Sequence, residues 1–283
     1  MRIRVSLRGQ DLTRPAREPA LVPADSVSWQ IFKNPLALFV GGVAAVILEL
    51  ADPAVRTGVW EHTDFRRDPR KRLVRTGLAA MVTVYGARSV AEKMIARVVA
   101  QHERVQGVTP GGEPYRANDP RLLTWVQATA AFGFIEAYRH YVRALTPAEI
   151  DQAYAEGAPA AALYGAPDAP RSDAERQILF EAMDRRLEPS PIVFEFLEIM
   201  RAAPILPRPL RRLQPLLIRA AVEITPVRVR ERLGLGTSLG LGSWQLKVVR
   251  RLGALADRMV LRRSPAVQSC RRLGLPGDYL YRR

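Results

Sequence analysis

Residues 122–145 read LLTWVQATAAFGFIEAYRHYVRAL and carry the clearest indication of the fold. Asp119 and Pro120 precede them. This pair is a typical helix start, because an aspartate side chain caps free amide groups and proline suits the first turn. The first half of the stretch is apolar on nearly every side of a helix, whereas a surface helix is apolar on one side only. We therefore predict a central helix that is buried on all faces.

Helical periodicity continues on both sides of this stretch, and alternating strand patterns are scarce. The main short exception is RIRVSL at residues 2–7. Proline, glycine and capping residues separate the helical segments. The predicted helices cover residues 36–50, 69–86, 89–106, 120–145, 147–163, 172–187, 190–202 and 244–263. The chain is therefore predicted to be all-α, a single helical domain with buried central helices and a basic C-terminal helical extension.

The composition favours one large domain with a tail. The chain has 283 residues, of which 48% are hydrophobic and 25% charged, as in ordinary soluble globular proteins. We predict an N-terminal arm at residues 1–30, a helical domain at 31–236 and a basic extension at 237–283. The glycine-rich run GLGTSLGLGS at 234–243 is interpreted as a linker. It is not a nucleotide-binding loop, because Leu239 stands where G-x-G-x-x-G needs its third glycine.

Cysteine usage and hydropathy indicate the compartment. Cys270 is the single cysteine, which excludes an intramolecular disulfide and any multi-cysteine zinc or iron–sulfur site. The N-terminal residues lack the apolar run of roughly 7 to 15 residues that a secretory signal requires. Residues 35–48 are uncharged but shorter than the roughly 18 to 20 residues that cross a bilayer, so they predict a buried core helix. We expect a cytoplasmic protein that can lie peripherally at the membrane.

The net charge of +15 is concentrated in the last third of the chain. Residues 201–283 hold 18 of the 43 Lys and Arg but only 4 of the 28 Asp and Glu. Such a segment attracts phosphate groups through a long-range field that salt screens. We expect an anionic membrane surface as the partner of this segment and do not expect nucleic acid. A non-enzymatic helical protein that docks through the basic tail is the alternative class of function.

The three histidines are the most informative residues for a site. They are His62, His102 and His140, and no two of them lie at i, i+4 on one helix with an acidic partner, so a zinc-protease site is excluded. His102 follows Val98 and Val99 by four and three residues, on the apolar stripe of its predicted helix. A buried imidazole needs partners for both ring nitrogens, either hydrogen bonds or a metal. The residues alone leave both readings of His102 open, and His140 is expected on a solvated face.

The predicted helix at 69–86 carries a second candidate cluster. Arg72, Arg75, Thr76 and Ala79 occupy neighbouring positions on one helical face. Two cations and a hydroxyl group directed toward a core would require an anionic group opposite them. The alternative is a solvated, basic first turn.

An ordered series of motifs resembles one known family. The motifs are DPAVRTGVWEHTDFRRDPRKRLVRTG at 52–77, HERVQG at 102–107, YRANDPRLLTWVQAT at 115–129, EAYRHYVRALTPAEID at 136–151 and ITPVRVRERLGLG at 224–236. Together they resemble the MpaB-type and latex clearing protein oxygenase superfamily. The resemblance covers roughly residues 35–236, and the order of the motifs is more specific than any one of them.

Members of that superfamily are all-helical and bind haem b through one proximal histidine. The characterised members use O₂ to cleave carbon–carbon double bonds in isoprenoid chains. The resemblance therefore implies a haem b-dependent oxygenase that acts with O₂ on an apolar, isoprenoid or lipid-like substrate. By the same resemblance, His102 corresponds to the proximal histidine that ligates the iron. His62 is the backup ligand or a distal polar group. A peroxidase-like haem protein is the runner-up, because a fold does not fix the reaction.

The resemblance also implies catalytic roles on the distal side of the haem. Arg72 and Thr76 resemble the arginine and threonine of the family's distal helix, where a cation and a hydroxyl group would stabilise charge that develops on reduced oxygen. Arg75 stands where latex clearing proteins carry a lysine that can occupy the distal iron site. An arginine cannot lose its proton to do so. The implied distal site is therefore open or filled by water.

Two points of the family pattern stay open in this chain. Many relatives have a histidine where this chain has Gln127; if that histidine is the ligand in their subfamily, this chain lacks it. The resemblance also implies a general base, for which the sequence offers several carboxylates. The candidates are Glu49, Asp52, Glu61 and Asp64.

Overall fold

A computed structural model describes residues 11–282, and it confirms the all-α prediction. The strand suggested by residues 2–7 lies outside the described residues. The α-helices are α1 (Val27–Phe32), α2 (Pro35–Glu49), α3 (Pro53–His62), α4 (Pro69–Tyr85), α5 (Arg88–His102), α6 (Pro120–Tyr141), α7 (Pro147–Tyr164), α8 (Asp173–Asp184), α9 (Pro191–Ala202), α10 (Gln214–Ile224), α11 (Val227–Arg232), α12 (Ser243–Arg258) and α13 (Pro265–Arg272). Short 3₁₀ turns occupy η1 (Arg208–Leu213), η2 (Thr237–Leu239) and η3 (Tyr279–Tyr281).

One local signal starts most of the long helices. A capping side chain is followed by proline at the first helical position, where its missing amide hydrogen costs no hydrogen bond. The pairs are Asn34-Pro35, Asp52-Pro53, Asp68-Pro69, Asp119-Pro120, Thr146-Pro147, Ser190-Pro191 and Ser264-Pro265. At Pro53 the sequence predicted only the end of a helix. The same proline begins α3, which periodicity alone did not reveal.

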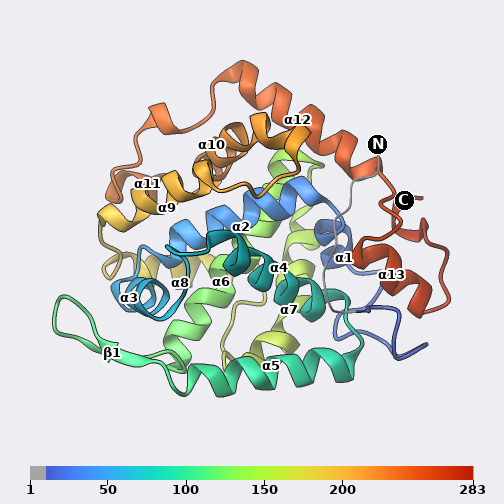
Figure 1. The fold of residues 1–283 in the computed structure, drawn as a ribbon, viewed down its shortest axis with the longest axis horizontal. Coiled ribbons are helices and arrows are strands. Elements are labelled where there is room, and N and C mark those ends of the chain that lie inside the picture. The colour runs from blue at the N-terminus through green and yellow to red at the C-terminus, as the bar shows by residue number, and fades with distance from the viewer. Residues whose placement is uncertain (1–10, 283) are drawn as a thin grey trace.

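The centre of the fold is the crossing of α2 and α6 (Figure 1). A Cβ atom on Gly41 would lie 2.7 Å from the carbonyl oxygen of Gly133, so glycine on both helices allows their backbones to touch. Trp125 of α6 is fully buried and donates from its indole nitrogen to the carbonyl oxygen of Leu48 at 3.3 Å. The predicted central helix is therefore confirmed, although one side of α6 borders a cavity rather than packed atoms.

The third predicted helix ends one turn earlier than expected. We predicted residues 89–106, but α5 ends at His102 and the chain turns into β1 (Gln106–Val108). This strand pairs antiparallel with β2 (Pro114–Arg116), with Gly107 opposite Tyr115. A strand of three residues is too short to show alternation, so only the turn between the strands could be predicted.

The basic C-terminal helices pack against the rest of the described chain. The ammonium group of Lys33 is buried and lies 3.1 Å from a carboxylate oxygen of Asp257 at the end of α12. Arg272 of α13 is also buried, and it donates to the carbonyl oxygens of Leu12 and Tyr85. Both described ends lie on the same side of the molecule (Figure 1). The domain boundary at residue 236 stays a prediction, and these contacts cross it.

The helices were also compared with the length and composition of a membrane span. Within residues 11–282, none of the individual helices has the length and apolar content to cross a bilayer. Only α2 and α3 taken together reach the required length and apolar content, and the two helices meet at a bend of 112°.

Candidate functional site

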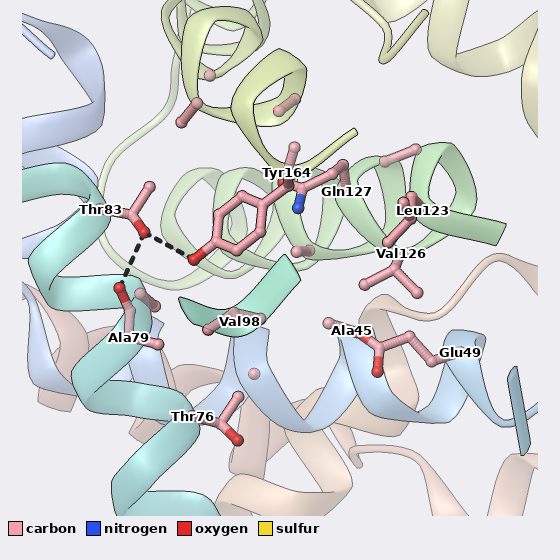
Figure 2. A pocket seen from close by; sticks show the side chains of 18 of the residues that line it. Ala45, Glu49, Thr76, Ala79, Thr83, Val98, Leu123, Val126, Gln127 and Tyr164 are labelled. Atoms are coloured by element: carbon pink, nitrogen blue, oxygen red, sulfur yellow. Dashed lines mark hydrogen bonds between the residues drawn. The ribbon is translucent and has the colours of Figure 1, made fainter. Parts of the chain in front are cut away.

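A cavity of about 790 Å³ lies beside the α2–α6 crossing, between these two helices and α4, α5 and α7. Its volume falls in the range of small-molecule sites, roughly 300 to 1,000 Å³. Most of its wall is apolar, and its lining residues include Val46 and Ala131. Figure 2 shows four others, Ala45, Val98, Leu123 and Val126. A cavity of this kind suits an apolar ligand that is held by a few polar groups.

His102 lines this cavity from the last turn of α5. Its ring nitrogen Nδ1 is buried and has no hydrogen-bond partner among the described residues. Burial lowers the pKa of His102, and the nearby positive charge of Arg72 lowers it further. The imidazole is therefore held in its neutral form, which is the form that ligates a metal.

One face of α4 contributes the predicted cluster to the same wall, including Arg72, Arg75 and Thr76. A guanidinium nitrogen of Arg72 donates to Oγ1 of Thr76 at 2.5 Å, and this hydroxyl group donates to the carbonyl oxygen of Arg72 at 3.0 Å. Arg72 is half-buried, whereas Arg75 and Thr76 also reach the exposed side of the helix. Residues 69–80 include no buried side chain, because this half of α4 separates the cavity from solvent. The structure thus brings the three residues together, and their catalytic roles stay predictions.

Among the four carboxylates that are candidates for the general base, Glu49 is the one that lines the described cavity. It lies in the last turn of α2 and lines the cavity (Figure 2). Burial raises its pKa from the ordinary value to about 7, against the opposing effect of Arg72. A carboxyl group with this pKa exchanges its proton near neutral pH, as a general base requires.

The other three carboxylates are placed differently. Asp52 is buried, but it caps α3 by accepting from the amides of Ala54 and Val55 at 2.9 and 3.0 Å. Glu61 and Asp64 are exposed and do not belong to the described cavity wall. The sequence could not separate Glu49 from them, because position within a helix does not reveal a cavity beside it.

The remaining predicted residues divide between the cavity and the surface. His62 lines the cavity, and its Nε2 lies 3.2 Å from the hydroxyl oxygen of Tyr115, so it already has a protein partner. Gln127 also lines the cavity, from α6 (Figure 2). His140 is half-exposed, and its Nδ1 lies 3.1 Å from the carbonyl oxygen of Glu136. This agrees with the polar face predicted for His140.

The groups in the wall fit haem by their chemistry. One histidine suffices as the proximal ligand of a haem iron. His102 offers a neutral imidazole with an unpartnered buried nitrogen. Arg72 and Arg75 offer cations at the same cavity, which suit the anionic edge of a porphyrin, and the apolar wall suits its faces.

Comparison with known proteins identifies a family. A family model described as "ER-bound oxygenase mpaB/B'/Rubber oxygenase, catalytic domain" matches residues 29–258. This range contains α2, α4, α5, α6 and α7, which enclose the cavity, and extends to the end of α12. No curated protein and no solved structure matches the chain.

Proposed function

Since this chain belongs to the family of mpaB and rubber oxygenase catalytic domains, we propose that it is a haem b-dependent oxygenase that acts with O₂ on an apolar substrate. The observation that carries the proposal is the position of His102, neutral and with an unpartnered buried nitrogen, in a cavity wall that also holds Arg72 and Glu49. Oxygenase chemistry follows from the family. The haem, the substrate and the roles of individual residues are the proposed part.

His102 would hold the cofactor through its imidazole. Gln127 lies in the same wall, but its amide side chain does not ligate haem iron as histidine does. When bound, haem supplies the redox chemistry that activates O₂. The apolar wall excludes water and so strengthens every electrostatic interaction inside the cavity. The same wall accommodates a hydrocarbon chain, in keeping with an isoprenoid or lipid-like substrate.

Arg72 and Thr76 would stabilise negative charge that develops during the reaction. Their mutual hydrogen bond fixes the guanidinium group relative to the hydroxyl group, so little reorganisation is needed. Arg75 adds a second cation at the same wall. Glu49 would accept a proton from the substrate on a carboxylate oxygen, because a pKa of about 7 leaves it partly ionised at neutral pH.

The test is the absorption spectrum of freshly purified full-length protein. We expect a Soret band in this spectrum. In an activity assay with the same protein, we expect O₂-dependent cleavage of an alkene. A colourless protein that stays colourless after haem is added would contradict the proposal. Peroxide-dependent oxidation of small donors without alkene cleavage would instead indicate the peroxidase-like alternative.

We also propose that the protein docks peripherally on an anionic membrane through the outward face of α12. Trp244 and Leu255 are exposed there, at 67% and 61%, and Met259, which directly follows the helix, is 50% exposed. Basic residues lie among them: Lys247, Arg250, Arg251 and Arg258 are exposed on the same helix. An aromatic and aliphatic surface with interspersed cations is typical of helices that lie in a bilayer interface, with the cations near lipid phosphates.

A further inference from the structure

The polar groups of the cavity fall into a charged set and a neutral set. Arg72 shifts the pKa of Glu49 and of His102, and Glu49 shifts the pKa of Arg72, so these ionisable residues form the first set, around the charge of Arg72. Thr83 of α4 and Tyr164 of α7 line the cavity further along α4. Eleven residues of helix separate Arg72 from Thr83, which is roughly 16 Å at the rise of an α-helix. Figure 2 shows Glu49 and the Thr83–Tyr164 pair on different sides of the view.

The hydrogen bonds of Thr83 determine where the phenolic proton of Tyr164 lies. Oγ1 of Thr83 donates to the carbonyl oxygen of Ala79 at 2.9 Å, and it lies 3.1 Å from the hydroxyl oxygen of Tyr164. A threonine hydroxyl has a single proton, and a carbonyl oxygen can only accept. Thr83 must therefore accept from Tyr164. The phenolic oxygen of Tyr164 is left with lone pairs and no proton to offer a ligand.

The surroundings of this oxygen are neutral and apolar. Burial raises the pKa of Tyr164, opposed only by the hydrogen bond with Thr83, and no charged group among the described residues contributes to the shift. The adjacent wall from α7 is formed by small residues that include Gly157, Ala160 and Ala161. A ligand group that meets Tyr164 there must therefore donate a hydrogen bond and carry no charge, since an ion would lose its hydration without compensation.

We propose that Tyr164 recognises a hydroxyl group on an otherwise apolar substrate by accepting its proton in a hydrogen bond. The inference rests on the proposed function, because it takes the cavity as the substrate site. Thr83 is the positioning residue, since it fixes Tyr164 as an acceptor. The substrate class is then an apolar alcohol rather than a plain hydrocarbon, with its hydroxyl group near Thr83, roughly 16 Å along α4 from Arg72.

Two ligands that differ only in the donor provide the test. Geraniol and its methyl ether share one apolar chain, and only the alcohol can donate. Isothermal titration calorimetry on the full-length protein, as purified, measures the ratio of their dissociation constants. We expect the alcohol preference to fall by roughly 3- to 10-fold in Tyr164→Phe, the effect of one neutral hydrogen bond.

Thr83 variants separate recognition from simple packing of α4 on α7. Thr83→Val removes the acceptor and frees the phenolic proton, so Tyr164 can donate to the ether. The preference should then shift toward the ether. Thr83→Ser keeps the hydroxyl group and should keep the wild-type ratio. A pair that only joins the two helices would lower stability in Tyr164→Phe and Thr83→Val without changing the ratio.

Several outcomes would overturn the inference. They are the absence of saturable geraniol binding, an unchanged ratio in Thr83→Val, or an unchanged ratio in Tyr164→Phe. If Tyr164→Phe does not fold, the Thr83 variants decide. Because binding needs neither haem nor turnover, a protein that prefers the alcohol but stays colourless after haem is added would contradict only the haem-dependent oxygenase proposal. A haem-loaded, active protein without the preference would contradict only this inference.

Discussion

Glu49 and Arg72 face one cavity from two different helices, and each shifts the pKa of the other. Burial raises the pKa of Glu49 to about 7, and the Arg72 guanidinium opposes that rise. Burial lowers the pKa of Arg72, and the Glu49 carboxylate opposes that fall. The pair therefore holds a carboxyl group that changes charge near neutral pH beside a cation in an apolar wall. Ionisation of the Glu49 carboxyl group lowers the stability of the fold, and the same group can exchange a proton during the reaction. These two properties lead to separate predictions.

Glu49→Gln should make the protein more stable at high pH. A carboxyl group whose pKa is raised from 4.5 to about 7 on folding stabilises the fold fully below pH 4.5. This contribution is lost as pH rises toward 7, by up to about 3 kcal/mol. Wild type should therefore lose stability over this window, and Glu49→Gln should lose less. The measurement is urea unfolding at pH 5 and pH 8.

Asp52→Asn is the control for that experiment, because Asp52 is buried but lies outside the cavity wall, where it caps α3. It should not reproduce the gain at pH 8. Parallel loss of stability in wild type and Glu49→Gln between the two pH values would contradict the raised pKa of Glu49.

Arg72→Leu should lower turnover by roughly 10²- to 10³-fold, the loss seen when a single electrostatic donor is removed from an active site. Without this cation the pKa of Glu49 should also rise, so the ascending limb of the pH–rate profile should move to higher pH. The measurement is the initial rate on an accepted alkene between pH 5 and 9. Arg70→Leu, on the exposed side of the same helix, is the matched control. Equal rates in the Arg72→Leu and Arg70→Leu variants would show that Arg72 does not take part in catalysis and acts as a solvated surface residue.

His102→Ala should purify with little haem, because the proposed iron ligand is removed. His62→Ala and His140→Ala should retain most of theirs, since His62 is hydrogen-bonded to Tyr115 and His140 lies at Glu136. The measurement is the Soret absorbance per protein, with circular dichroism to verify folding. Full haem occupancy in a folded His102→Ala would exclude this residue, and selective loss in His62→Ala would identify the backup ligand.

The sequence predicted those parts of the fold that depend on local signals. The Asp119-Pro120 start and the apolar run after it were sufficient to predict α6 as the central helix, which the structure confirms. Helical spacing brought Arg72, Thr76 and His102 forward as candidate site residues, the family resemblance implied their roles, and all three line one cavity. Short elements such as α3 and the β1–β2 hairpin carry too few residues for a periodic signal.

Long-range relationships could not be predicted in the same way. Glu49 ends an apolar helix, and its raised pKa depends on a cavity that several other helices enclose. Thr83 and Tyr164 are 81 residues apart, and neither belongs to a motif that indicated a pair. One C-terminal helix was predicted, at residues 244–263, and it corresponds to α12, whereas α13 was not predicted. Their attachment through Lys33 and Arg272 requires contacts with the N-terminal part of the chain. Packing between distant segments decides each of these features.

The proposed membrane contact has to be tested by substitution rather than by truncation. Lys33 and Asp257 join α12 to the core, and Gly253 of α12 packs against the backbone of Tyr141, so removal of the helix would expose buried surface. Trp244→Ser combined with Leu255→Ser changes only exposed side chains. The double variant should fold and still lose binding to vesicles, because it removes the apolar part of the interface.

Vesicles of phosphatidylcholine with and without phosphatidylserine provide the measurement, by sedimentation at low and high salt. Wild type should sediment only with the anionic vesicles, and binding should weaken as salt screens the cations of α12. Ile178→Ser is the matched control, since Ile178 on α8 is 67% exposed, the same fraction as Trp244, but lies on another helix. Because general stickiness of exposed apolar residues would affect both positions alike, equal binding by the control and the double variant would exclude α12 as the docking surface. Binding that is insensitive to both salt and phosphatidylserine would exclude the electrostatic part of the proposal.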